Sequence, residues 1–424
     1  MNNQPRNQEE LMALLQDLQP KTFLAGLHLP YGTVLGTDEP QNLLDANIPH
    51  LPFGRNLEEI ESLKQIIASI SNGCEGKNNT NIQEVVERII SEETTIPLDN
   101  YHMAVTADGA RGAIIDLLTP LINPKKNIIS YGNPNWVFDK IIGMIGGAID
   151  LTVPATNADE FVSRLENLPP KILDRMLGII IVDPSNPGGY TFSEWHIKRI
   201  DELTEEYNIL PIFDDVFRGL QAVGEQHSSS KYSKRGIIVE TTSKKYSARG
   251  LGVTWSLVPK TLGINYAADM NIECDGCREI AAVNLAAMHK NQFNETVREY
   301  LIANTNAFMA GFEMSTGEIS DKGTFSSAFE GMPIFNYHPP KTTTTSVLKQ
   351  ASLMQKVMVT SGLDWFKTSP LGNRFFKDEN SAAIEHSSHY LRICPTKETP
   401  EKHFYAGMKL GSLVAASSEI ESKR

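Results

Sequence analysis

Residues 240–255 place hydroxyl, lysine, arginine and glycine side chains between two short apolar segments. The segments 237–239 and 253–258 are β-branched and bounded by turn residues, which is typical of buried strands. A lysine at the end of a buried strand has little water around it, so its neutral amine becomes accessible and can form a Schiff base with an aldehyde. The hydroxyls before Lys244 and the guanidinium of Arg249 could hold a phosphate. The alternative is a surface loop with ordinary lysines.

Two more charged residues lie within or directly after apolar segments. Asp214 follows residues 209–213, and an acidic side chain at the end of a buried strand needs a partner. Arg392 is a single charge in the apolar segment 389–394, where a guanidinium is costly unless it binds an anion. Its planar fork suits a carboxylate, which it can bind through two parallel hydrogen bonds. The alternative for Arg392 is a structural salt bridge.

A glycine-containing turn could bind an anion. Gly109 and Ala110 lie between a strand expected at 103–106 and a helix expected at about 111–121. At the start of a helix the free N–H groups and the helix dipole point outward together, which favours a phosphate. The alternative is an ordinary turn between a strand and a helix.

Two other strand ends contain residues suited to a flat, polar ligand. Trp136 follows a strand expected at 128–130, where its indole could stack on an aromatic ring. Asn186 lies in the segment 183–189, whose two prolines and two glycines indicate a tight, unusual loop. The alternatives are a tryptophan of the core and an asparagine with a structural role.

The stretch around Lys244 resembles the Schiff-base lysine segment of pyridoxal 5'-phosphate (PLP) enzymes of the aminotransferase class I/II family. That segment reads Ser-x-Ser-Lys, one or two aromatic or small residues, and then Gly-x-Arg-x-Gly. The residues that fall in register are Thr241, Ser243, Lys244, Tyr246, Gly250 and Leu251. Gly252 occupies the place of the usual arginine, and Arg249, three residues earlier, is the nearest guanidinium.

The resemblance implies catalytic roles. Lys244 would hold PLP and then move a proton as general base and acid. Asp214 matches the first aspartate of the family's Asp-x-x-Tyr and would keep the cofactor's ring nitrogen protonated. Phe217 stands where that motif has its tyrosine, which is a departure from the family. Asn186 would donate to the cofactor's phenolic oxygen and border the substrate, and Arg392 would bind the substrate's α-carboxylate.

The resemblance also implies how the rest of the cofactor is held. Trp136 would stack on its ring. The residues around its phosphate would be Gly109, Ala110, Thr241, Ser243 and Arg249.

The elements that position these residues follow one another as strand, turn and helix over 103–258. This order is typical of an α/β fold with a mostly parallel sheet and helices on both faces, whose binding sites lie at the carboxyl ends of the strands. A long helix expected at 284–309 leads to a smaller α+β domain. The expected division is an N-terminal arm over 1–50, a large PLP-binding domain over 51–285 and a small C-terminal domain over 286–424, the fold type I arrangement implied by the resemblance.

Composition narrows the possible partners. The chain has 424 residues and a formal net charge of −12, which argues against a nucleic-acid partner. No apolar run is long enough to predict a membrane helix. Four cysteines in a chain of this length, and an N-terminus unlike a signal peptide, favour the cytoplasm. Cys274 and Cys277 form a single C-x-x-C without a second pair, so no metal site is expected.

The expected function is that of a PLP-dependent aminotransferase, which transfers an amino group between an amino acid and a 2-oxo acid in amino-acid metabolism. The proline-rich arm and the resemblance together predict a homodimer. Phe217 and the displaced Arg249 keep open a PLP-dependent lyase, decarboxylase or cyclase on the same scaffold. An acyl-CoA-using synthase of this fold usually stacks a histidine on the cofactor, so Trp136 argues against it. A non-catalytic ligand-binding protein is a further alternative, against which Lys244 stands.

Overall fold

The computed structural model describes residues 81–106, 109–135, 137–220, 228–246, 252–264, 275–290, 292–317, 319–326, 335–341, 343–355, 357, 359–394 and 400–422. The expected N-terminal arm lies outside these residues, as do Trp136 and Arg249.

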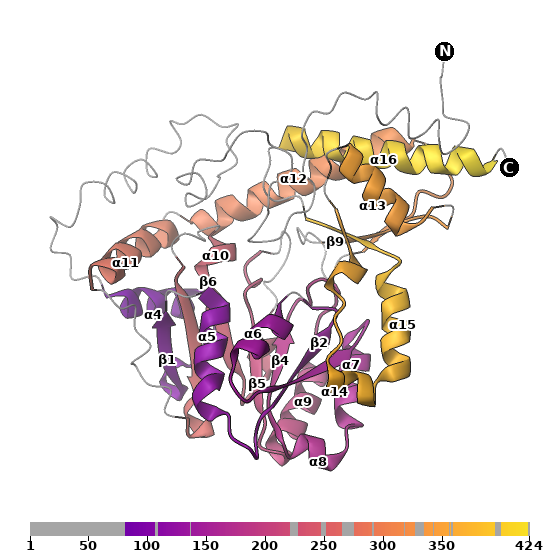
Figure 1. The fold of residues 1–424 in the computed structure, drawn as a ribbon. Coiled ribbons are helices and arrows are strands. Elements are labelled where there is room, and N and C mark those ends of the chain that lie inside the picture. Colours follow the sequence, from indigo (N-terminus) through magenta and orange to yellow (C-terminus); the bar gives the residue numbers. More distant parts are fainter. Residues whose placement is uncertain are drawn as a thin grey trace.

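A seven-stranded sheet forms the centre of the larger lobe, with the strand order β1-β7-β6-β5-β4-β2-β3 (Figure 1). The strands are β1 (Tyr101–Thr106), β2 (Ile128–Asn133), β3 (Ile149–Pro154), β4 (Met176–Val182), β5 (Leu210–Asp214), β6 (Ile237–Thr241) and β7 (Thr254–Pro259). The neighbouring strands β3, β2, β4, β5 and β6 pair in parallel. Strand β7 runs antiparallel to its neighbours β6 and β1. The mostly parallel sheet predicted from the sequence is confirmed.

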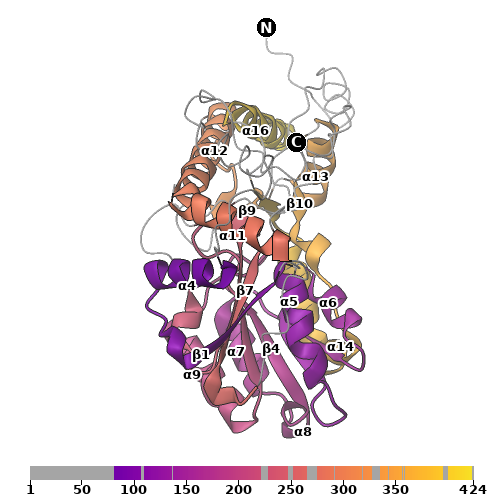
Figure 2. The ribbon, with the colours of Figure 1, turned by 90° about the vertical axis from the view of Figure 1, so that its left-hand side faces the viewer.

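Helices cover both faces of this sheet, as predicted (Figures 1 and 2). Consecutive residues of a strand point to opposite faces, and the central strand β4 shows this directly. Ile180 packs in a buried cluster with Ile114 and Ile141, whereas Ile181 packs in another with Phe161 and Ile197. The helices of the first face are α5 (Gly109–Leu118) and α6 (Phe138–Met144), and those of the second include α7 (Ala158–Glu166), α8 (Pro170–Leu173) and α9 (Glu194–Glu206). Because both faces are covered, β4 is apolar along its whole length.

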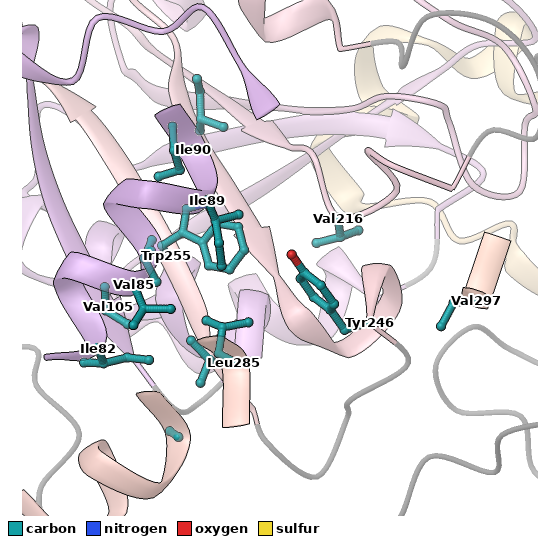
Figure 3. Close-up of a cluster of buried hydrophobic side chains, with 14 of the residues drawn as sticks. Ile82, Val85, Ile89, Ile90, Val105, Val216, Tyr246, Trp255, Leu285 and Val297 are labelled. Atoms are coloured by element: carbon teal, nitrogen blue, oxygen red, sulfur yellow. The ribbon is translucent and has the colours of Figure 1, made fainter. Parts of the chain in front are cut away.

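A third buried cluster lies where α4 (Ile82–Glu93) meets α11 (Asp275–Lys290). Val85 and Ile89 of α4 pack against Trp255 of β7 and Leu285 of α11 (Figure 3). Tyr246, which follows the segment around Lys244, belongs to the same cluster. The lysine segment is therefore supported from behind by α4 and α11.

The smaller lobe contains a four-stranded antiparallel sheet in the order β10-β11-β9-β8. Its strands are β8 (Thr324–Ser326), β9 (Phe335–His338), β10 (Thr360–Ser361) and β11 (Leu391–Ile393). The helices beyond α11 are α12 (Phe293–Thr316), α13 (Thr345–Met354), α14 (Pro370–Phe375), α15 (Lys377–Ser387) and α16 (Pro400–Ser422). Within the described ranges, no helix has both the length and the apolar character needed to span a membrane.

Two glycines allow α12 and α16 to pack closely. A Cβ atom at Gly311 would lie 1.9 Å from the carbonyl oxygen of Phe404, and one at Gly407 would lie 2.0 Å from that of Phe308. Neither distance is possible for a real side chain, so both positions require glycine. The contact fixes α12, which leads out of the larger lobe, against the C-terminal helix.

The single long helix predicted over residues 284–309 is wrong. The chain instead forms α11 up to Lys290 and a second helix, α12, from Phe293. Gln292 between them has a φ of 51°, in the left-handed region, which a continuous right-handed helix cannot contain. The apolar spacing continues across this break, so periodicity alone did not reveal it.

Candidate active site

Lys244 and Asp214 lie at the carboxyl ends of two neighbouring parallel strands. Asp214 is the last residue of β5, and Lys244 lies in the short helix α10 (Thr242–Lys245) directly after β6. The two strands pair with Asp214 opposite Val239. The Lys244 Nζ atom lies 4.1 Å from the ring centroid of Phe217, which belongs to the turn after β5. The sequence prediction that strand ends bring these residues together is supported by this geometry.

Burial favours the uncharged forms of Asp214 and Lys244 and shifts the pKa of each accordingly. It raises the pKa of the Asp214 carboxyl to about 6, although the charge of Lys244 acts in the opposite direction. It lowers the pKa of the Lys244 amine to about 8, although Asp214 counteracts this effect. A minor but useful fraction of Lys244 is thus neutral near neutral pH, the form in which an amine can react with a carbonyl group.

Asp214 retains an unused acceptor. Its Oδ1 atom is buried and meets no hydrogen-bond donor among the described residues. A buried carboxylate oxygen without a donor is costly, so the site lacks one hydrogen-bonding group. The protonated ring nitrogen of PLP is a donor of the required kind, and the arrangement fits this cofactor.

Arg392 and Asn186 meet in the space between the two lobes' sheets. Arg392 of β11 is completely buried, and its Nε atom donates to Asn186 Oδ1 at 2.9 Å. Its two terminal nitrogens find no oxygen acceptor among the described residues. Burial lowers the Arg392 pKa, and the nearby Cys394 thiol opposes that shift. The guanidinium therefore keeps a free fork, which can receive a carboxylate bidentately.

Some of the residues predicted around a phosphate already make hydrogen bonds within the chain. Thr241 is the N-cap of α10, because its hydroxyl accepts the backbone N–H of Ser243 at 3.2 Å and lies 3.2 Å from the Val253 carbonyl oxygen. Gly109 begins α5 with a φ of +70°, a conformation that favours glycine, and no atom of the described residues lies within 4 Å of where its Cβ atom would be. Ala110 follows it in the first turn of α5. None of the described residues blocks the space beside Gly109, where the sequence predicts the phosphate.

Arg111 is a residue that the sequence analysis missed. It follows Ala110 in the first turn of α5, and its charge contributes to the lowered pKa of Lys244, as does that of Arg392. The start of α5 and strand β11 thus face the same space as Lys244. The signal available in the sequence was a guanidinium directly after a phosphate-type turn.

Asp215, the residue after Asp214, has hydrogen-bond partners of its own. It is buried, and its Oδ2 atom accepts hydrogen bonds from Ser228 at 2.6 Å and Ser230 at 2.5 Å. Behind it, the buried guanidinium of Arg218 lies 2.6 Å from Glu240. The buried charged side chains of Asp215, Arg218 and Glu240 hold the turn after β5 against the end of β6. Ser228 and Ser230 lie 13 and 15 residues further along the chain, beyond the reach of local spacing rules.

Lys245 points away from Lys244, toward α4. Its Nζ atom pairs with Glu93 Oε2, and its aliphatic part lies on Gly219, where a Cβ atom would approach to 3.3 Å. The Tyr246 hydroxyl lies 3.2 Å from His289 Nδ1, and Lys245 borders a cavity of about 420 Å³. The second lysine is thus held by an ion pair at the back of α10.

Comparisons with known proteins agree with this fold. The family model for aminotransferase class I and II matches residues 71–362, most of the chain, and the chain belongs to that family. Enzymes of this family act with PLP, the cofactor that the unused Asp214 oxygen fits.

Relatives of known sequence match over shorter stretches. An aspartate aminotransferase of Bacillus sp. (strain YM-2) is 25% identical over 147 residues, which cover 34% of this chain and 37% of the relative. A probable aspartate aminotransferase of Methanocaldococcus jannaschii is 24% identical over 231 residues, which cover 52% of this chain and 60% of the relative. The chain thus spans less than two thirds of the length of each of these relatives.

Solved structures match over nearly the whole chain. The multiple substrate aminotransferase from Thermococcus profundus has a TM-score of 0.66 at 16% identity, covering 98% of this chain and 95% of its own. An aminotransferase from Neisseria meningitidis has a TM-score of 0.66 at 14% identity, covering 97% and 98%. At these identities the likeness shows the fold.

Proposed function

We propose that this protein is a PLP-dependent aminotransferase that transfers an amino group between an amino acid and a 2-oxo acid. The observation that carries the proposal is that three buried polar groups lie near one another: Asp214 and Lys244 at strand ends of the large sheet, and Arg392 from β11, whose charge acts on Lys244. Asp214 has a buried oxygen without a donor, Lys244 has a lowered pKa, and Arg392 has a buried fork without an oxygen acceptor. Together they would meet the ring nitrogen, the aldehyde carbon and the substrate carboxylate.

The roles of the chain's own residues follow from their chemistry. When bound, PLP withdraws electrons from the substrate's Cα. Lys244 would hold the cofactor and then take up and return the proton at Cα, because its pKa lies near the working pH. Asp214 would keep a proton on the ring nitrogen by supplying the negative charge opposite it. Phe217 borders the Lys244 amine without a hydroxyl, so it contributes shape but no hydrogen bond.

Asn186 would connect the cofactor to the substrate subsite. Arg392 Nε can only donate, so the atom that it meets is the Asn186 carbonyl oxygen. The Asn186 Nδ2 group is then oriented as a donor, as the role at the phenolic oxygen requires. Arg392 would hold the α-carboxylate of both the amino acid and the oxo acid. Gly109, Ala110, Thr241, Ser243, Arg249 and Trp136 are proposed to surround the cofactor, with Arg111 as a further cation near the phosphate.

We also propose that the chain is a cytoplasmic homodimer divided into an arm, a large domain and a small domain. The support is the proline-rich N-terminal sequence, the few cysteines and the membership of the family. Sedimentation of the purified protein tests the assembly, and a monomer with full activity would contradict it.

The activity is tested by incubating the purified, PLP-loaded protein with single amino acids and either pyruvate or 2-oxoglutarate. Formation of the new amino acid in equal amount to the new oxo acid is the expected result. The same protein with Lys244→Ala is the control. Release of ammonia or carbon dioxide without a new amino acid would instead indicate a lyase or a decarboxylase.

A further inference from the structure

We propose that Trp365 determines which anions the Arg392 subsite accepts: its indole covers one side of the guanidinium and admits only a planar anion that lies in the plane of the fork. This inference rests on the proposed function of Arg392. The guanidinium carbon lies over the indole ring, 5.5 Å from its centroid. Trp365 is itself only 5% exposed, so the stack is an interior contact. A cation over an indole face is attracted most strongly when water is excluded.

Hydrogen bonds to the end of β2, in the larger lobe, fix the backbone around Trp365. It is the last residue of the 3₁₀ helix η7 (Gly362–Trp365), which follows β10. Its carbonyl oxygen accepts the backbone N–H of Asn135 at 3.2 Å, and Asn133 Oδ1 accepts that of Lys367 at 3.0 Å. Asn133 ends β2, and Asn135 lies in the turn that follows it. The indole is therefore held at the edge of the large sheet, although it comes from the smaller lobe.

The strand pairing places Trp365 beside Arg392 from a second direction. Strand β10 pairs with β11 so that Thr360 lies opposite Arg392. The Gly362 N–H donates to the Tyr390 carbonyl oxygen at 3.1 Å, and a Cβ atom at Gly362 would lie 2.2 Å from the Tyr390 ring. Glycine at 362 thus lets η7 pass close to β11. The stack is a consequence of two neighbouring strands rather than of a mobile side chain.

The chemical character of the neighbours explains why a tryptophan suits this place. A carboxylate beside Arg392 would stabilise the buried cation but would also occupy its fork. Among the described residues the guanidinium meets Asn186 Oδ1 through Nε and the indole of Trp365 over its carbon, and the Cys394 thiol lies nearby. The indole stabilises the cation without using either terminal nitrogen. The fork stays available, and the side covered by the ring is closed to any bulky group.

This arrangement predicts discrimination by the shape of the anion. A carboxylate is planar, so its two oxygens can meet the two terminal nitrogens while its plane runs parallel to the indole. A phosphonate is tetrahedral, so when two of its oxygens lie in that plane, either its third oxygen or its carbon substituent projects toward the ring. Replacing Trp365 by a smaller side chain should remove its stabilisation of the Arg392 cation. It should also make room for the group of the phosphonate that projects out of the plane.

The test uses calorimetric titration of the PLP-loaded protein with propionate and with ethylphosphonate. In Trp365→Leu we expect the Kd for propionate to rise by roughly 3- to 20-fold, the range of a buried cation–π contact. The Kd for ethylphosphonate should stay unchanged or fall, so that the preference for the carboxylate is lost. Trp365→Phe keeps a ring and should lie between the two proteins. Trp195→Phe, at a tryptophan that is 56% exposed, is the matched control and should change neither constant.

Equal weakening of both anions in Trp365→Leu, or no change in either, would overturn the inference. Should Trp365→Leu fail to fold, Trp365→Phe decides by the same ratio of the two constants. Arg392→Lys separates this inference from the proposed function. If Arg392→Lys leaves the binding of propionate unchanged, the carboxylate role of Arg392 is wrong. If Arg392→Lys weakens propionate and the Trp365 variants do not alter the ratio, only the role of Trp365 is wrong.

Discussion

Lys244 and Lys245 are consecutive and both buried, yet the two sides of α10 surround them differently. On the Asp214 side, Lys244 faces Asp214 and the ring of Phe217. On the Glu93 side, Lys245 is paired with Glu93, next to Tyr246 and His289. Burial lowers the pKa of both amines. Burial alone therefore does not distinguish a reactive lysine from a structural one.

The difference lies in whether the neighbouring carboxylate has an oxygen without a hydrogen-bond donor. Glu93 is committed to Lys245, whereas Asp214 keeps a buried oxygen without a donor in the described part of the chain. A closed ion pair stabilises the fold, and an open one leaves room for a ligand. On the Asp214 side one hydrogen bond to the carboxylate is missing, and a protonated ring nitrogen would supply it. On the Glu93 side the carboxylate is already paired.

The largest expected contrast is in catalysis. Lys244→Ala should lower kcat by about 10²–10⁴-fold, because the proton of the substrate's Cα loses its acceptor. Lys245→Met should keep kcat within about tenfold, since we assign Lys245 no proton transfer. The measurement is steady-state kinetics with the donor found in the amino-acid screen. Similar losses in both variants would remove the distinction between the two sides.

The stability of the cofactor-free protein should respond in opposite directions. Glu93→Gln should lower the free energy of unfolding by about 3 kcal/mol at pH 6, where the buried Lys245 amine is protonated, because it leaves that ammonium without its Glu93 partner. Asp214→Asn should raise it at pH 7.5 by up to about 3 kcal/mol, since a carboxylate whose pKa is raised by burial destabilises the folded state when ionised. Urea unfolding followed by circular dichroism measures both. Destabilisation by Asp214→Asn would show that Asp214 is already satisfied.

The effect of Asp214→Asn should also depend on pH with a defined sign. The Asp214 pKa is about 6 in the folded protein and 3.8 in its unshifted form, so between these values the folded protein binds the extra proton. Wild-type stability should therefore fall as pH rises from about 4 to 6, relative to Asp214→Asn. Unfolding curves at pH 4, 5, 6 and 7.5 check this. An advantage of the asparagine variant that is constant across this range would contradict the raised pKa.

The smallest effect concerns the aromatic ring beside each lysine. Phe217→Tyr would add a donor near the cofactor's ring oxygen and should lower the pH of the absorbance transition of the bound cofactor by about one unit. Tyr246→Phe is the matched change on the Glu93 side and should leave that transition in place. Absorbance titration of the three proteins measures it. A transition that stays or rises in Phe217→Tyr would mean that residue 217 does not face the cofactor.

Much of the Asp214 side could be predicted from the sequence, because its residues lie at the ends of apolar strands. Asp214 and Lys244 follow such segments, and a parallel sheet gathers strand ends at one edge. Arg392 is a single charge within an apolar segment, which becomes a strand of the smaller, antiparallel sheet. The roles of these residues remain proposals, whereas the sheet that places them is observed.

The Glu93 side could not be predicted, because its contacts join residues that are far apart. Glu93 and Lys245 are 152 positions apart, and Tyr246 and His289 are 43 apart. Nothing in the local pattern indicates that the Lys245 side chain points toward α4. Nor does it indicate that His289, near the end of α11, lies beside the Tyr246 hydroxyl. The break at Gln292 and the stack of Trp365 on Arg392 were missed for a related reason, since each depends on backbone conformation or packing rather than on spacing.

The central claim, that the Asp214 side and not the Glu93 side is the reactive one, is tested most directly by reductive labelling. The PLP-loaded protein is reduced with borohydride and digested, and the modified peptide is fragmented by mass spectrometry to separate Lys244 from Lys245. The account predicts a phosphopyridoxyl group on Lys244, retained in Lys245→Met and lost in Lys244→Ala. A label on Lys245 in the wild-type protein would contradict it.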